Sequence, residues 1–115
     1  MPGKVKGYVP KKGDFLAVTF DPQSGHEQRG RRPALVVSNT LFNERTGLTL
    51  VCPLTTTDRG YPFHVAVTGN PDVKGLVMVE QVKSIDYRAR RAKPIGKASN
   101  DLLDEVLSIL DACIY

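Results

Sequence analysis

One change in the spacing of apolar residues, close to residue 99, sets the strongest constraint on how this chain folds. Before it, short runs rich in β-branched residues are bounded by Gly, Pro, Asn and Asp, which is typical of strands joined by turns. We expect strands at residues 15–20, 34–38, 48–54, 63–67, 75–85 and 92–95, with one helical turn at 40–45. Many short strands with few helices predict a mainly β fold, a small barrel.

The segment after residue 99 has the spacing of an α-helix, and Ser99 or Asn100 can cap its start. Its apolar residues are Leu102, Leu103, Val106, Leu107, Ile109, Leu110, Cys113 and Ile114. At ~100° per residue these side chains cover an arc of about 160°, wider than one face on a small barrel requires. Either a second copy of the chain covers the surplus, or the helix is sunk deeply into its own barrel.

Composition excludes several classes of protein. The chain has 115 residues, 41% hydrophobic and 24% charged, so we expect one folded domain over residues 1–115 rather than disorder. No run approaches the ~18 apolar residues of a membrane span, and the basic leading segment lacks the apolar stretch of a signal peptide. Cys52 and Cys113 are too few to staple such a fold, so we expect buried free thiols and a cytoplasmic protein.

Charge is segregated along the chain, which has a net charge of +4. Basic residues gather near the N-terminus, in the loop with Arg29, Arg31 and Arg32, and between Lys83 and Lys97, whereas the final helix holds four acids and no base. Any one such run is commonly a solvated face. Three basic groups on one β-barrel can, however, form a groove for a phosphate backbone.

Residues 20–38, FDPQSGHEQRGRRPALVVS, form the most unusual stretch. They leave one expected strand and enter another, so their turn-forming residues predict a long surface loop, and such loops are commonly functional. Glu27 offers a carboxylate base beside guanidinium groups, whose planar donors fit phosphate oxygens. Pro33 holds Arg32 in an extended conformation at the mouth of the next strand, where its side chain can be aimed rigidly.

The segment VCPLTTTDRGYPF carries a second group of polar residues. Pro53 interrupts the expected strand, and Thr55, Thr56 and Thr57 present hydroxyls at its end. These hydroxyls either hold a phosphate or form capping and turn hydrogen bonds. The residues alone favour the turn role.

Both segments, together with GLVMVEQVKSIDYRARRAKPIG, resemble the MazF/PemK family of toxin endoribonucleases, in the same order and from about Gly13 to the C-terminus. The resemblance implies an SH3-like β-barrel of the CcdB/PemK type with a C-terminal helix. It also implies a homodimer that cuts single-stranded RNA, including mRNA, at short sequences without a metal or cofactor. A cognate, MazE-like antitoxin is expected to hold such a toxin inactive.

The resemblance also assigns the site. Its arginine falls on Arg32, its threonine on Thr55, and the glutamate of its E-Q pair on Glu27. The residues expected to contact RNA are Gln28, Arg29, Arg31, Thr56, Tyr61, Glu80, Gln81, Lys83 and Arg88. The Kid/PemK branch also implicates an aspartate and an arginine of its D-Q strand motif, but VMVEQ has Glu80 and Met78 there, which puts that scheme in doubt.

These residue types fit attack of a ribose 2′-hydroxyl on the adjacent phosphate, which leaves a 2′,3′-cyclic phosphate and a 5′-hydroxyl. Arg32 is expected to neutralise charge on the phosphoryl oxygens, and Thr55 to donate a hydrogen bond to them. Glu27 is the expected base, whereas His26 is an RNA contact or a bystander. The acid that protonates the leaving oxygen stays unassigned, because an arginine keeps its proton up to a pH of ~12.

Two other functions stay open. The gyrase poison CcdB is similar in fold and docks through C-terminal residues that include tryptophan, whereas this chain has no Trp. A catalytically inactive homologue that binds RNA or antitoxin is the second. Incubation of the protein with RNA, beside a gyrase assay, separates these functions from RNA cleavage.

Overall fold

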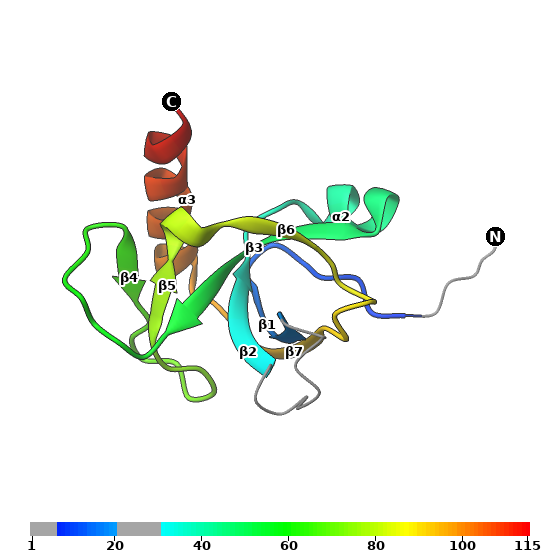
Figure 1. Cartoon of the computed structure of the whole chain (residues 1–115), viewed down its shortest axis with the longest axis horizontal. Coiled ribbons are helices and arrows are strands. Elements are labelled where there is room, and N and C mark those ends of the chain that lie inside the picture. The colour runs from blue at the N-terminus through cyan, green and yellow to red at the C-terminus, as the bar shows by residue number, and fades with distance from the viewer. Residues whose placement is uncertain (1–6, 21–30) are drawn as a thin grey trace.

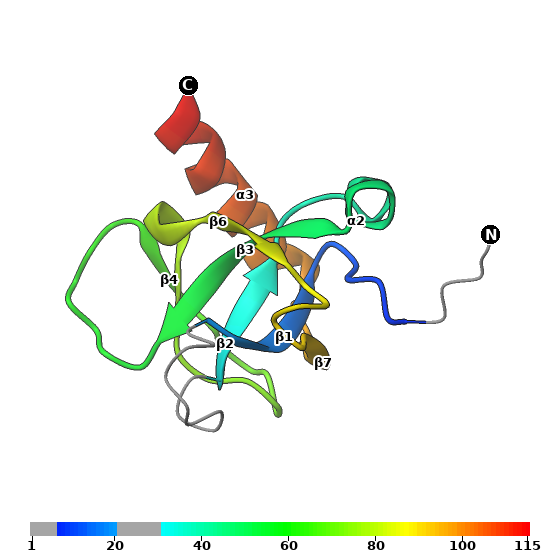
Figure 2. The ribbon, with the colours of Figure 1, turned by 45° about the vertical axis from the view of Figure 1, so that its right-hand side comes forward.

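The computed structural model describes residues 7–20 and 31–115 of the chain. Its strands are β1 (Asp14–Thr19), β2 (Arg31–Val36), β3 (Leu48–Thr55), β4 (His64–Ala66), β5 (Leu76–Met78), β6 (Lys83–Asp86) and β7 (Lys93–Lys97). Its helical segments are α2 (Thr40–Thr46), the 3₁₀ turn η1 (Val79–Gln81) and α3 (Asn100–Ile114). The strands form one antiparallel sheet, and α3 packs beside β4 and η1 (Figure 1, Figure 2). The predicted mainly β fold with a C-terminal helix is confirmed.

Strand β3 organises the sheet. The pairing order is β4-β5-β3-β2-β1-β7, and β6 joins β3 outside this path. Residues 48–51 of β3 pair with β6, whereas Leu54 and Thr55 pair with β5. The single strand predicted at residues 75–85 is therefore wrong, because η1 breaks it into β5 and β6, which pair with opposite ends of the same strand. Among the described strands, β4 and β7 end the order and do not pair with each other.

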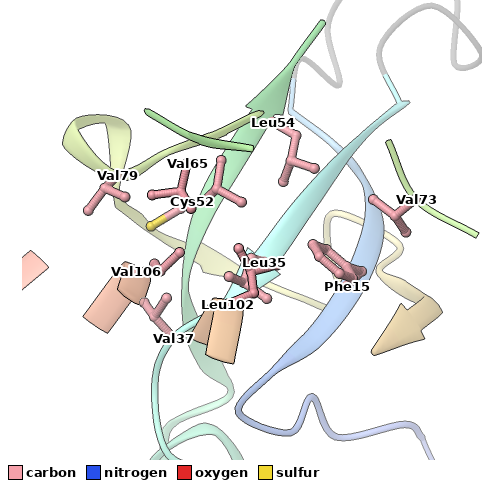
Figure 3. Close-up of a cluster of buried hydrophobic side chains, with 11 residues drawn as sticks. Phe15, Leu35, Val37, Cys52, Leu54, Val65, Val73, Val79, Leu102 and Val106 are labelled. Atoms are coloured by element: carbon pink, nitrogen blue, oxygen red, sulfur yellow. The ribbon is translucent and has the colours of Figure 1, made fainter. Parts of the chain in front are cut away.

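The central strands are buried on both faces. Phe15 belongs to the cluster beneath α3, together with Leu35 and Cys52 (Figure 3), whereas its neighbour Leu16 points into a second cluster on the other face. The second cluster contains Leu16, Val18, Ala34, Val36, Val51 and Ile85, with Tyr8, Phe20 and Ala92 packed against it. Successive side chains of a strand point to opposite faces, so burial of both faces explains why these runs are continuously apolar.

The two cysteines are free thiols, as predicted, but only one is buried. Cys52 lies in the cluster beneath α3, and burial raises the pKa of its thiol to about 12. The expectation that Cys113 is buried is wrong, because the last turn of α3 is exposed.

Helix α3 begins at the predicted cap. The hydroxyl of Ser99 accepts a hydrogen bond from the backbone N–H of Leu102 at 3.1 Å. Leu102 and Val106 point into the sheet (Figure 3), whereas the C-terminal turns of the helix extend past the sheet in both ribbon views (Figure 1, Figure 2). Ile114 is 64% exposed, so the single chain does not bury the whole apolar arc of this helix.

None of the helices in the described part of the chain is long and apolar enough to cross a membrane.

Candidate active site

The two segments singled out in the sequence meet at one end of β2 and β3. Ala34 pairs with Pro53 in an antiparallel register, and two further steps along that register bring Arg32 opposite Thr55. Both residues line a pocket of about 290 Å³. We call it the threonine pocket and define it by Arg32, Thr55, Thr56, Thr57 and Lys74. The structure therefore brings together the predicted arginine and threonine.

Thr55 makes a turn hydrogen bond and can still donate one to a ligand. Its hydroxyl oxygen accepts a hydrogen bond from the backbone N–H of Thr57 at 3.1 Å, which is the turn role. A hydroxyl that accepts one hydrogen bond still has its own O–H to donate. The turn thus orients the Thr55 hydroxyl at the pocket and leaves its proton for a ligand.

Lys74 is a pocket residue that sequence reasoning missed. It precedes β5, and its segment is fixed on one side by Asn70, whose side-chain amide donates to the Lys97 carbonyl at 3.0 Å. On the other side lies Gly75, at φ +127°, so close to β3 that a Cβ there would lie 2.7 Å from the Thr55 carbonyl oxygen. Only this pairing of β3 with β5 brings Lys74 near Arg32, and no local pattern signals it.

The threonine pocket is cationic. Arg32 and Lys74 line it, and none of its lining residues in the described part of the chain is an acid. Within residues 7–20 and 31–115, neither cation has a hydrogen-bond or ion-pair partner. Two unpaired cations beside hydroxyl donors favour an anion, and a guanidinium matches the oxygens of a phosphate.

Arg31 has a different role from its neighbour. Its guanidinium donates to the Thr19 hydroxyl at 3.0 Å, to the Ala17 carbonyl at 2.9 Å and to the Arg91 carbonyl at 2.8 Å. These bonds tie the start of β2 to β1 and to the turn before β7. The structure gives Arg31 a positioning role, and the predicted RNA contact stays a prediction.

A second polar group lies on β4, on η1 and in the loop before β4. The His64 Nε2 and a Glu80 carboxylate oxygen are 3.0 Å apart, and the Tyr61 and His64 ring centroids are 5.0 Å apart. The His64 side chain is only 3% exposed, and its buried Nδ1 has no hydrogen-bond partner among the residues that the structure describes. The structure thus joins two predicted RNA contacts, Tyr61 and Glu80, with Gln81 adjacent in η1. The sequence analysis did not single out His64.

The remaining predicted contacts are scattered. The Lys83 ammonium lies 4.9 Å from the centroid of the Phe20 ring, a cation–π contact. Arg88 lies beside Gly7, in the turn that follows β6. It does not line the threonine pocket. The predicted base Glu27, with His26, Gln28 and Arg29, lies outside the described residues.

No group of three or more side chains able to hold a metal ion occurs among the residues that the structure describes.

Comparisons with known proteins identify the family of this chain. Residues 11–114 match the family described as PemK-like, MazF-like toxin of type II toxin-antitoxin system. The endoribonuclease toxin MazF of Escherichia coli K12 is 41% identical over 96% of this chain and 98% of its own. The endoribonuclease toxin ChpB of the same strain is 42% identical over 90% and 93%. The chain belongs to the MazF/PemK family of type II toxins and is a homologue of the endoribonuclease toxin MazF, which confirms the resemblance.

Solved structures show the same fold. The crystal structure of MazF from Deinococcus radiodurans (Form-I) superposes with a TM-score of 0.84 at 42% identity, over 94% of this chain and 98% of that one. A MazE–MazF structure from the same organism (Form-II) gives a TM-score of 0.82 at 37% identity, over 94% and 97%.

Proposed function

We propose that this chain is an endoribonuclease that cuts single-stranded RNA, including mRNA, with the scissile phosphate in the threonine pocket. The observation that carries the proposal is the meeting of Arg32, Thr55 and Lys74 in one pocket, which no acid among residues 7–20 and 31–115 lines. The relatives that are endoribonucleases by name support the reaction class. The cytoplasm, where mRNA is found, is the proposed site of action.

The mechanism that we propose uses the RNA's own hydroxyl as the nucleophile. The ribose 2′-oxygen bonds to the adjacent phosphorus and the bond from phosphorus to the 5′-oxygen breaks, which leaves a 2′,3′-cyclic phosphate and a 5′-hydroxyl. Arg32 and the free O–H of Thr55 act on the phosphoryl oxygens, where negative charge grows in the transition state. Glu27 is proposed as the base that takes the 2′-hydroxyl proton. The leaving 5′-oxygen must also receive a proton, from a donor that we do not assign.

The reaction is expected to need no added metal. Purified protein in EDTA should cut single-stranded RNA, because the nucleophile and the charge-stabilising groups of the proposed mechanism belong to the RNA and the chain. A single 2′-deoxy substitution at the cut nucleotide should abolish cleavage there, because it removes the nucleophile. Primer extension on a long natural RNA maps the cuts. Cleavage of the deoxy substrate, or strict dependence on magnesium, contradicts the mechanism, and intact RNA with inhibited gyrase favours the CcdB-like alternative.

The proposal also includes a homodimer that covers the free apolar surface of α3. Light scattering at micromolar concentration should give twice the 12.6 kDa mass of one chain. Ile114→Asp should shift the protein toward monomer, because the side chain is 64% exposed in the single chain and a charge opposes its burial between two chains. Asp104→Asn, on the exposed side of the same helix, is the matched control. A monomeric wild type refutes the dimer.

Two further parts of the proposal concern shape and control. An SH3-like barrel is supported by the turn between β6 and β7, because the Arg90 carbonyl accepts a hydrogen bond from the Thr19 backbone N–H at 3.0 Å and so links this turn to β1.

A MazE-like antitoxin is the proposed inhibitor, supported by the solved MazE–MazF structures of Deinococcus radiodurans. Acidic side chains of such a partner would pair with Arg32 and Lys74 and so compete with RNA.

A further inference from the structure

A second hollow adjoins the threonine pocket. It has a volume of about 180 Å³, and Ala17, Pro33, Val73 and Ile95 form its aliphatic walls. Arg31 and Asp72 also line it. We call it the apolar hollow. Arg32, Pro33 and Lys74 line both spaces, so the two cations stand at the wall between a hydroxyl-lined site and an aliphatic one.

Three sets of contacts build the walls of the apolar hollow. The Arg31 guanidinium holds the Ala17 carbonyl at 2.9 Å, which fixes the wall from β1 and β2. The Asn70 carboxamide oxygen accepts from the backbone N–H of Val73 at 3.1 Å, while its amide group bonds to β7. A Cβ at Gly96 would lie 3.3 Å from a Val73 methyl, so the loop and β7 are in close contact. A site built in this way requires little ordering when a ligand enters.

Size and chemistry together define the occupant. An apolar protein cavity of ~150 Å³ accommodates benzene, so a hollow of about 180 Å³ suits one planar ring. Aliphatic side chains can contact the faces of such a ring. Ile95 is 38% exposed, so part of its apolar surface is free to make such a contact. A nucleotide carries its planar base a short distance from its phosphate, which matches an aliphatic hollow next to a cationic, hydroxyl-lined pocket.

We propose that the apolar hollow binds the nucleobase next to the phosphate held in the threonine pocket, and so contributes to the choice of cutting sequence. The inference rests on the proposed function, since it assumes that the threonine pocket holds an RNA phosphate. The shared wall of Arg32 and Lys74 favours a nucleobase over an apolar peptide side chain, because a nucleobase is always joined to a phosphate that these two cations can bind.

The test is a double-mutant cycle in which one change fills the hollow of the protein, the other removes one base of the RNA, and the binding affinity is measured. Its probe is an RNA of mapped cutting sequence with a 2′-deoxy substitution at the cut nucleotide, so that binding is measured without cleavage. Single abasic sites are placed at each position in turn. Ala17→Leu fills the hollow from its β1 wall without altering Arg32 or Thr55. Ala89→Leu, at an exposed alanine in the turn between β6 and β7, is the matched control.

The expected result is that the effects of the filled hollow and the missing base are non-additive at one position only. In the wild type and in Ala89→Leu, one abasic site next to the cut should weaken binding about tenfold, as loss of a base contact does. In Ala17→Leu that same abasic site should have no further effect, because the base is already excluded, while other positions keep their wild-type effects. If Ala17→Leu melts below the wild type, Ile95→Ala, which removes part of the wall from β7, should reduce the same abasic effect.

Each other outcome overturns the inference. Additive effects at every position, with RNA cleavage by the wild type intact, remove the nucleobase site but leave the proposed function standing. Unchanged RNA binding by Ala17→Leu, with weakened binding of an antitoxin peptide, assigns the hollow to the peptide instead. A wild type that neither binds nor cuts RNA refutes both the inference and the proposed function.

Discussion

We expect the Arg32→Ala variant to cut RNA at least about a hundredfold more slowly than the wild type, and to melt at the same temperature. Loss of one donor aimed at a transition-state oxyanion commonly lowers a rate by ~10²–10³. Stability should be unaffected, because the exposed Arg32 side chain has no hydrogen-bond or ion-pair partner in the described part of the chain. Single-turnover cleavage and thermal melting measure the two effects.

Two companion variants sharpen this experiment. Arg32→Lys keeps the charge but loses the planar pair of donors, so its rate should fall between those of the wild type and the alanine variant. Arg45→Ala removes an exposed arginine of α2, beside the opposite end of β3, and should leave cleavage unchanged. Wild-type rates in Arg32→Ala would mean that the scissile phosphate is not held in the threonine pocket.

The Gly75→Ala variant should lose both stability and cleavage. A non-glycine residue at φ +127° is strained by ~1–3 kcal/mol, and the added Cβ would also lie 2.7 Å from the Thr55 carbonyl oxygen. We therefore expect a total loss of about 3 kcal/mol in the free energy of unfolding, a fall of roughly 10 °C in Tm for a domain of this size. Cleavage should also slow in the folded fraction, because β5 must move away from Thr55 and carries Lys74 with it.

A Gly60→Ala variant separates the energy of backbone strain from that of the steric contact. It has a φ of +69°, but a Cβ there would meet nothing within 4 Å. Gly60→Ala should therefore lose only the ~1–2 kcal/mol of a left-handed backbone and keep its rate of cleavage. Chemical denaturation of both variants gives the comparison. Equal losses would show that the approach of Gly75 to Thr55 has no energetic weight.

The sequence predicted the helices and strands of this fold better than how they pair and pack with one another. Most expected strands, the turn at α2 and the Ser99 cap of α3 are confirmed, because each depends on residues close together in the chain. The strand expected at residues 75–85 failed because the apolar run continues through η1, where the chain bends. The burial expected for Cys113 failed because helical periodicity does not say where a helix leaves the sheet.

The candidate site divides in the same way. Arg32 was singled out by its place before Pro33, and Arg32 and Thr55 were both assigned by the family resemblance that their motifs carry. Lys74 was not, because it lies nineteen positions from Thr55 in the sequence and only β5 brings it back. His64 was missed as well, since its contact with Glu80 depends on the pairing of β4 with β5.

The adjacent residues Arg31 and Arg32 show where the limit lies. The sequence by itself placed both in the loop that leads into a strand expected at 34–38. In the structure β2 already begins at Arg31, and strand geometry sends the two side chains to opposite faces. Only the tertiary structure decided which face has backbone carbonyls to bind a guanidinium and which face opens to the threonine pocket. The physical reason is that element type follows from neighbouring residues, whereas the surroundings of a side chain follow from the register of strands distant in sequence.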